Sequence, residues 1–482
     1  MHRYDRFLSR WVCLIAAGWL GGFVAAAADL PPAASPGLPP PAASPGLPPL
    51  PEDLIPALRP ILVSALAQSP QMLAKTIDVA RAEGERISAR SGLLPTLGTN
   101  LRYGSNTTTS TNGSSSSNSG FFYDISANQA IYHWGALKAR ADIGKIGLRI
   151  AERSYADAYR QLIVALRGQF LELVEKKIGL RNAEFAVQRA EAALATAKEG
   201  MTAKALPPGS DVGAQLAVDD ARLTRDKVAE DLESSEKLFA LSIGQPDFAP
   251  QNIPDDVPKP AYLPEVVTQL VQQFIKEEGE GTYAIANLHD SIKQADLNYQ
   301  IARVGLRPMI GFSAFYSQQT QSQQLQNQSG GNYIQQYVTR SNNYNIVANW
   351  SIFDGLATRG AKLSTLSAKR GFERELRTTV DQTLAQARDL AQKLAFAWRT
   401  LDLAQRRRDM AEGGVGGATD YVKRGLYSAD TIEGARMGFY QAELTLALAR
   451  TDFLNQWSSF VSTLCVDPML TVIPDRYLHD AK

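Results

Sequence analysis

The chain has 482 residues, a formal net charge of +1 and 21% charged residues, a balance that gives no signature of a nucleic-acid partner. Its four histidines and two cysteines leave little material for a metal site or for disulfide bonds. No cluster of catalytic side chains is evident, so we expect no metal, no cofactor and no enzymatic activity.

The first 28 residues are typical of a secretory signal peptide. Arginines near the start precede an apolar run from Trp11 to Ala28, and this run ends in small residues. Residues 29–53 then carry a tandem proline-rich repeat, which predicts an extended leader. No later stretch approaches the run of about 18 apolar residues that a membrane helix needs. Any passage through a membrane must therefore involve strands.

The rest of the chain consists of two copies of one unit. Residues 123–132 (YDISANQAIY) return at residues 344–353 as YNIVANWSIF. Two further matches flank these segments: residues 89–98 with 302–311, and Gly200-Met201 with Gly425-Leu426. The duplication predicts, in chain order, a first structural repeat at 54–244, an inter-repeat linker at 245–264, a second repeat at 265–464 and a C-terminal tail at 465–482.

Each repeat is expected to contain one β-hairpin with a long polar loop. Apolar residues alternate with polar ones in both copies, as in a strand with one apolar and one polar face. About ten such residues cross a bilayer as a tilted strand. The positions predicted to face lipid are Tyr123, Ile125, Ile131, Tyr344, Ile346, Trp350 and Ile352.

After each hairpin the apolar period changes to that of packed helices. Residues 134–200 and 354–425 are predicted to be long helices, because apolar residues recur at steps of three and four without a proline. Each is followed by a return helix, at 212–241 and at 431–464. Shorter helices are expected at 54–90, interrupted at Pro70, and at 265–306.

Four strands per chain cannot close a barrel by themselves, and open strand edges are not tolerated in lipid. Three copies would supply a barrel of about twelve strands. The predicted fold is therefore mainly α-helical, with duplicated coiled-coil hairpins forming an α-barrel and four strands per chain completing a β-barrel in a trimer.

On these features the chain resembles the TolC-like family of outer-membrane channels, the outer membrane factors. The resemblance covers residues 54–464. It rests on the duplicated plan, on Gly-Leu-Leu-Pro at 92–95, and on Ser-Ile-Phe-Asp-Gly at 351–355, which is similar to the family's Pro-Leu-Phe-Asp-Gly. The first copy departs from the pattern, because Ile-Tyr-His-Trp-Gly at 131–135 lacks the aspartate.

The resemblance implies a homotrimeric exit duct in the lipid of a Gram-negative outer membrane, with a periplasmic extension. The duct would serve a tripartite efflux pump or a type I secretion system and would pass its cargo without chemistry. The implied partners are a periplasmic membrane-fusion adaptor and, indirectly, an inner-membrane pump of the RND, ABC or a similar class. The cargo is not predicted.

Two sets of residues near the helical turns are candidate sites. Gly200, Met201, Gly425 and Leu426 occupy the predicted tip turns, where the resemblance implies adaptor contact and glycine permits a tight reversal. Plain turn glycines are the alternative. Asp430 and Glu433 are three residues apart and share a helix face, so threefold repetition would give an acidic constriction that favours cations. A solvated helix start is the alternative here.

The alternative class of protein is a trimeric coiled-coil structural protein or adhesin at the cell surface or in the periplasm. Trimeric autotransporter adhesins also share a barrel among three chains, but their strands lie together at the C-terminus. Here the two hairpins are far apart in the sequence, with long helices between and after them. This arrangement favours the channel.

Overall fold

The computed structural model describes residues 47–109, 115–205, 207, 209–246, 248, 253–326, 332–428 and 430–477. These residues belong to the second of two compact units, residues 41–482. The predicted signal peptide and residues 29–46 of the predicted leader lie outside the described residues.

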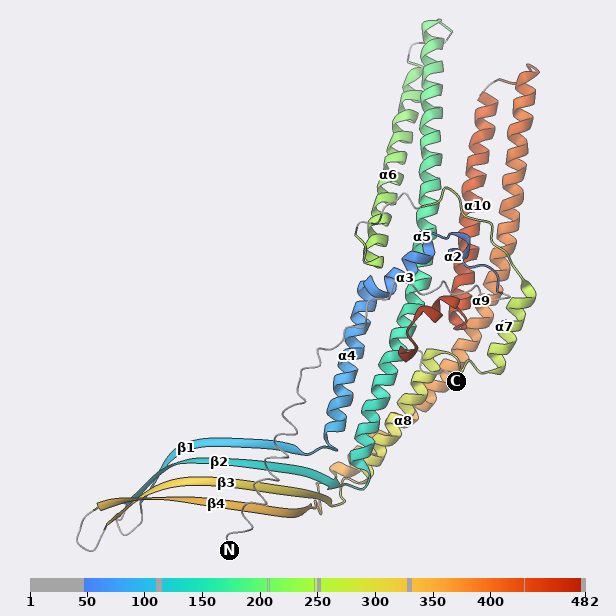
Figure 1. The fold of residues 1–482 in the computed structure, drawn as a ribbon. Helices are drawn as coiled ribbons and strands as arrows, with labels where there is room; N and C mark the ends of the chain where they lie inside the picture. Colours follow the sequence, from blue (N-terminus) through green and yellow to red (C-terminus); the bar gives the residue numbers. More distant parts are fainter. Residues whose placement is uncertain are drawn as a thin grey trace. The chain divides into compact units, whose positions relative to one another are not determined.

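The described chain is mainly α-helical with one sheet of four strands, as predicted (Figure 1). The first repeat contains α2 (Pro51–Leu54), α3 (Leu58–Gln68), α4 (Pro70–Ser91), β1 (Thr96–Thr109), β2 (Ser115–Tyr132), α5 (Ala136–Thr202) and α6 (Asp211–Ile243). The second contains α7 (Pro264–Lys276), α8 (Tyr283–Arg303), β3 (Met309–Gln326), β4 (Asn332–Asn349), α9 (Ala357–Lys423) and α10 (Asp430–Thr463), followed by the short 3-10 helices η2 (Pro468–Val472) and η3 (Asp475–Tyr477).

The duplication extends to the length of the long helices. Both α5 and α9 have 67 residues. Ala136 and Ala357, their first residues, are separated by the same 221 positions as Tyr123 and Tyr344 in the strands. Each long helix pairs with its return helix, α5 with α6 and α9 with α10. The predicted helical hairpins are therefore present in both repeats.

The predicted heptad seams form the core. One cluster of buried residues includes the predicted seam of α5, which consists of Tyr155, Tyr159, Leu162, Leu166 and Leu173. A second cluster joins α9 to α10 through residues such as Leu394, Leu401 and Phe453. These apolar side chains recur on one face of each helix, and their burial provides the main favourable term for packing.

Two glycine-containing segments behave differently in the structure. Residues 265–306 do not form the one predicted helix, because the chain turns between α7 and α8, where Glu278 and Gly279 adopt left-handed φ values of 50° and 69°. By contrast, the four glycines at 413–417 do not interrupt the long helix α9, which is continuous through them. Tertiary packing decides both cases, since glycine alone is only a weak helix breaker.

The segments predicted as leader, linker and tail take part in the helical core. Leu50 of the leader is buried beside α9 and α10. In the linker, Val257 is buried and its carbonyl accepts a 2.6 Å hydrogen bond from Arg450 of α10. In the tail, Tyr477 stacks on Tyr155 of α5 with ring centroids 4.2 Å apart. The linker thus packs against the helices, since the Ile253 carbonyl also accepts a 2.7 Å hydrogen bond from Lys177 of α5.

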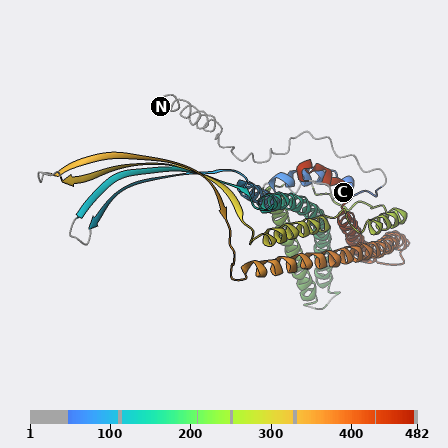
Figure 2. The same cartoon turned by 90° about the horizontal axis from the view of Figure 1, so that it is seen from below.

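All four strands form a single antiparallel sheet in the order β1-β2-β3-β4. The two hairpins therefore lie next to each other, joined by the pairing of β2 with β3. In Figures 1 and 2 the strands leave the helices at one end and run side by side as a curved ribbon. Strands β1 and β4 are the edges of this sheet.

Candidate functional site

The register of the sheet sorts its side chains into an apolar and a polar face. Residues directly opposite each other in neighbouring strands share a face. Ile125 lies opposite Tyr316, and Ile346 lies opposite Phe312. The apolar members of the first face are Leu97, Leu101, Tyr103, Phe121, Tyr123, Ile125, Ala127, Ile310, Phe312, Ala314, Tyr316, Val338, Tyr344, Ile346 and Ala348, and we call it the apolar face. It also carries polar residues, among them Thr99, Gln129, Gln318, Thr320, Arg340 and Asn342. The other face carries mostly Ser, Asn, Gln and Gly residues.

Four of the seven positions predicted to face lipid, Tyr123, Ile125, Tyr344 and Ile346, lie together on the apolar face. Ile346 is 78% exposed in the single chain. An exposed sheet face of large apolar side chains requires a covering that the described residues do not provide.

The other three predicted positions depart from this face. A β-bulge between Ala130 and Tyr132 shifts the register, so that Tyr132, and not Ile131, lies opposite Ile310. Strand β4 ends at Asn349, which leaves Trp350 and Ile352 in the connection to α9. The simple alternation read from the sequence missed the bulge because an inserted residue leaves no compositional mark.

The two helical tips have the same backbone motif. At the end of α9 the Leu426 N–H donates to the Tyr421 carbonyl and the Gly425 N–H donates to the Val422 carbonyl, each at 2.9 Å. At the end of α5 the Ala205 N–H donates to the Gly200 carbonyl at 2.8 Å and the Lys204 N–H donates to Met201 at 3.0 Å. These are paired Schellman motifs, in which one residue must adopt a left-handed conformation.

The residue in the left-handed position differs between the tips. It is Gly425 at the second tip (φ 73°) and Lys204 at the first (φ 57°), and these two residues are again separated by 221 positions. Gly200 and Met201 are therefore not the counterparts of Gly425 and Leu426, because they lie within the last turn of α5. The sequence comparison matched Gly200 to Gly425, but the residue equivalent to Gly425 is Lys204, so the chain reverses at a lysine in the first tip.

Asp430 and Glu433 lie in the first turn of α10, directly after the second tip. Asp430 is exposed, and Glu433 forms an exposed ion pair with Arg436 at 3.1 Å. Both carboxylates are accessible near the end of the helical hairpin.

Sequence reasoning missed a buried charge network that joins the two ends of the described chain. Arg167 of α5 is fully buried, and its Nε donates to Oε2 of Glu52 in α2 at 2.8 Å. Its Nη1 donates to Asp467 Oδ2 at 2.5 Å and to Ser458 Oγ of α10 at 3.0 Å. Burial raises the pKa of Glu52, and the charge of Arg167 only partly opposes that rise.

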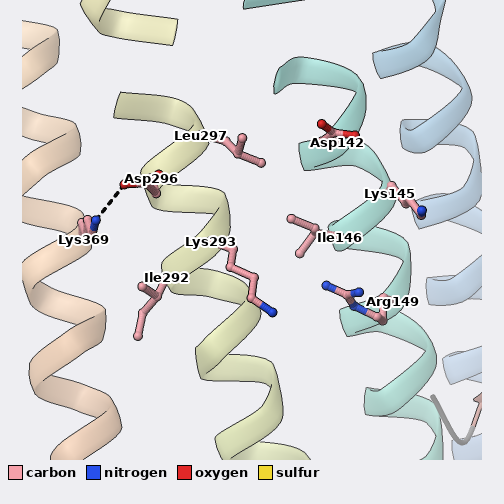
Figure 3. A pocket seen from close by; sticks show the side chains of 9 residues that line it. All are labelled: Asp142, Lys145, Ile146, Arg149, Ile292, Lys293, Asp296, Leu297 and Lys369. Atoms are coloured by element: carbon pink, nitrogen blue, oxygen red, sulfur yellow. Dashed lines mark hydrogen bonds and ion pairs between the residues drawn. The ribbon is translucent and has the colours of Figure 1, made fainter. Parts of the chain in front are cut away.

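An open groove of about 570 Å³ lies between α5, α8 and α9 (Figure 3). On one side Asp296 of α8 pairs with Lys369 of α9 at 2.7 Å. Beside the groove Arg149 and Arg153 of α5 both bind Asp290 of α8, at 2.7 and 2.6 Å. Burial opposes ionisation of Asp290, but the two arginines outweigh it and lower the pKa of this carboxyl. The charges around the groove thus hold three helices together.

Two kinds of site are not found in the part of the chain that the structure describes. No described helix is both long and apolar enough to cross a membrane. Among the same residues, no three His, Cys, Asp or Glu side chains are grouped so that they could hold a metal ion.

Comparison with known proteins identifies part of the chain. Residues 61–237 match the family model described as outer membrane efflux protein. This segment is therefore similar to outer membrane efflux proteins. The predicted resemblance to TolC-like channels is thereby confirmed. A sequence search of curated proteins finds no match.

Solved structures share the fold of most of this chain. The outer membrane protein VceC from Vibrio cholerae is 14% identical, with a TM-score of 0.63, and the match covers 84% of this chain and 95% of VceC. The CmeC outer membrane channel of Campylobacter jejuni is 13% identical, with a TM-score of 0.65 and 85% of each chain covered. The MtrE outer membrane channel of Neisseria gonorrhoeae is 16% identical, with a TM-score of 0.61, over 85% of this chain and 89% of MtrE.

Proposed function

We propose that three copies of this chain form an outer-membrane exit duct that serves a tripartite efflux pump or a type I secretion system. The observation that carries the proposal is the amphipathic sheet, whose edge strands β1 and β4 each pair on one side only among the described residues. Strands in lipid need partners on both sides. Three sheets joined edge to edge would satisfy every strand and enclose their polar faces around a wet lumen.

The helices support the same assembly. Phe396, Leu403 and Met410 lie seven residues apart on α9 and are 64%, 49% and 77% exposed. A heptad stripe of exposed apolar residues is typical of a helix that packs against another helix. On α6, Leu216 and Leu223 form a second stripe, 65% and 53% exposed. A second copy of the chain is the natural partner for both stripes.

The tips are proposed to dock a periplasmic membrane-fusion adaptor, which would connect the duct to an inner-membrane pump. At the second tip Leu426 and Tyr427 are 63% and 58% exposed, and Tyr421 packs edge-on against Tyr427. Such apolar side chains around a tight turn suit contact with the end of a partner helix. The function of the duct itself is passive, and the pump supplies the energy.

Disulfide cross-linking between copies tests the assembly. Each variant carries two introduced cysteines in a Cys465→Ser background, one on β1 at position 97, 99 or 101 and one on β4 at position 344, 346 or 348. If β1 of one copy pairs with β4 of the next, one of these combinations should yield covalent trimers in membranes. In the control variants one of the two cysteines is moved by one residue, so that the two side chains point to opposite faces of the sheet. A protein that stays monomeric and soluble for every pair contradicts the proposal.

A further inference from the structure

The segments that join the helices to the sheet carry an excess of positive charge. All four strands meet the helices at the same end of the sheet, since Tyr132 pairs with Ile310 and Met309 pairs with Asn349. The joining segments are residues 90–95, 133–140, 303–308 and 350–362, which we call the junction. The junction contains Arg90, Lys138, Arg140, Arg303, Arg307, Arg359 and Lys362, and a single acidic residue, Asp354.

These cations lack counter-ions within the described chain. No described acidic residue forms an ion pair with any of the seven, and six of them are exposed, while Lys362 is partly buried. The carboxylate of Asp354 accepts a 2.8 Å hydrogen bond from the Thr358 N–H at the start of α9. It is therefore engaged by its own helix.

A few helical turns away from the junction, several cations have acidic partners. There Arg86 pairs with Glu83 at 2.5 Å, Arg149 with Asp290 at 2.5 Å, and Lys369 with Asp296 at 2.7 Å. These three cations of the helical part thus have acidic partners in the chain. Other described helical cations, such as Arg374 and Arg388, form no ion pair, so the junction is distinguished by its local excess of seven cations over one acidic residue.

Two of these cations lie where the helix dipole disfavours them. Lys138 and Arg359 are the third residues of α5 and α9, at helix N-termini that carry no acidic residue in their first turns. Positive charge at a helix N-terminus is unfavourable. The two positions are also equivalent in the two repeats, being separated by 221 residues. Both repeats therefore place a cation where folding of the single chain gives no electrostatic benefit.

The junction also exposes large apolar and aromatic side chains next to the cations. Arg307 stacks over the Trp134 ring, with 4.7 Å between its Cζ and the ring centroid, and the Trp134 indole donates to the Pro308 carbonyl at 3.0 Å. Trp134 in turn packs against Tyr132, at the end of the apolar face of the sheet. The other exposed apolar side chains are Leu93, Leu94, Leu306, Trp350, Ile352, Phe353 and Leu356. Aromatic and basic residues together at the edge of an apolar band are typical of a lipid headgroup region.

We propose that the junction is a binding surface for the anionic phospholipids of the membrane leaflet that faces the helices. The proposal rests on the proposed function, because it takes the apolar face of the sheet to be in lipid. The phosphate groups of the headgroups would supply the negative charge that the chain lacks at this level, while Trp134 and its apolar neighbours enter the acyl boundary. This interaction fixes the depth of the sheet in the bilayer.

Fluorescence quenching by brominated lipids tests the proposal. The full chain carrying Trp11→Phe and Trp19→Phe is reconstituted into phosphatidylcholine vesicles with one fifth phosphatidylglycerol, with either lipid brominated in turn. Trp134 and Trp350 report on lipid contact, while Trp398 and Trp457, which pack among the helices, give a baseline. We expect phosphatidylglycerol to be preferred over phosphatidylcholine by roughly fivefold, the factor for one Lys or Arg near an anionic surface. Because the charges are exposed, this preference should fall as salt is raised.

The test variant combines Arg90→Gln, Arg140→Gln, Arg307→Gln and Arg359→Gln, and it should lose most of the preference. The control variant combines Arg388→Gln, Arg406→Gln, Arg407→Gln and Arg424→Gln, and so removes the same number of positive charges from α9 and its tip. This control should keep the preference for phosphatidylglycerol. Should the native chain insert but show equal quenching by both lipids at every salt concentration, the inference is overturned and the proposed duct stands. If both variants lose the preference for phosphatidylglycerol equally, the inference is overturned as well. If the chain fails to insert even into pure phosphatidylcholine, the proposed function fails as well.

Discussion

At the scale of single residues, the two tips perform the same reversal with different residues in the left-handed position. For a side chain with a Cβ atom that conformation costs about 1 kcal/mol or more, whereas glycine adopts it freely. Gly425 at the second tip avoids the cost, and Lys204 at the first tip carries it. The first tip is therefore expected to be the less stable of the two.

Substitutions at these two positions should have opposite effects. Gly425→Ala should destabilise the second tip by about 1 kcal/mol, and Lys204→Gly should stabilise the first by up to about 1 kcal/mol. Amide hydrogen exchange of peptides from the two tips measures each effect, since the exchange rate of a locally opening turn follows its stability. Gly413→Ala in the interior of α9 is the matched control and should slow exchange, because alanine favours a helix. Slower exchange at the second tip in Gly425→Ala would contradict this account.

Glu175 of α5 makes stability depend on pH near neutrality. Burial raises the pKa of this carboxyl to about 7 from its ordinary value near 4.5. Between these values the folded chain keeps a proton that the unfolded chain has released, so stability falls as pH rises from about 4.5 to 7. Because Glu175 is only partly buried, we expect the change to be on the order of 1 kcal/mol.

Unfolding of Glu175→Gln between pH 5 and pH 8 measures this contribution. The variant should be more stable than the native chain at pH 8 and nearly equal to it at pH 5. Glu184→Gln, nine residues further along the same helix at an exposed side chain, should leave the pH dependence unchanged. An identical pH slope in Glu175→Gln and in the native chain would show that this carboxyl does not titrate with folding.

At the scale of elements, periodicity predicted the long helices and their buried seams, because both follow from residues that repeat along one face. It failed where a single residue decides the geometry. The bulge before Tyr132 and the left-handed Lys204 change the register or the turn without altering composition. Glu52 was assigned to a mobile leader because prolines surround it, and only the folded chain reveals that Arg167 binds it.

The buried Arg167 network fastens α2 and the C-terminal 3-10 helices to α5. Arg167→Met would leave the carboxylates of Glu52 and Asp467 buried without a counter-charge, and such losses cost about 3–5 kcal/mol. Denaturant unfolding should show this decrease, and limited proteolysis should show earlier cleavage on both sides of the network. The loss should diminish at acidic pH, because protonation removes the unpaired charges.

The matched control removes all three charges at once with Arg167→Met, Glu52→Gln and Asp467→Asn. This triple variant should recover part of the lost stability, since a neutral site no longer contains unpaired buried charge. A triple variant less stable than Arg167→Met alone would indicate that the side chains act through packing. Because the network lies in the helical core, neither variant should alter the sheet.

At the scale of the whole molecule, each repeat supplies one β-hairpin and one long helical hairpin, and neither is complete in a single chain. The sheet has two unpaired edges and an exposed apolar face, while the helices expose further apolar stripes. In the proposed trimer the duplicated units would provide six similar building blocks. Such a quasi-sixfold arrangement requires helices of equal length in the two repeats, as α5 and α9 have.

The selectivity of the assembled duct depends on where the start of α10 lies in the trimer. If Asp430 and Glu433 face a narrow lumen, six carboxylates surround it and cations are favoured over anions. Reversal potentials in planar bilayers under a salt gradient should then shift toward zero in the variant Asp430→Asn, Glu433→Gln. The control variant is Asp402→Asn, Glu412→Gln, which neutralises two exposed acids on α9 and should keep the native selectivity. If the first variant also keeps native selectivity while conductance persists, these carboxylates are a solvated helix start and the constriction lies elsewhere.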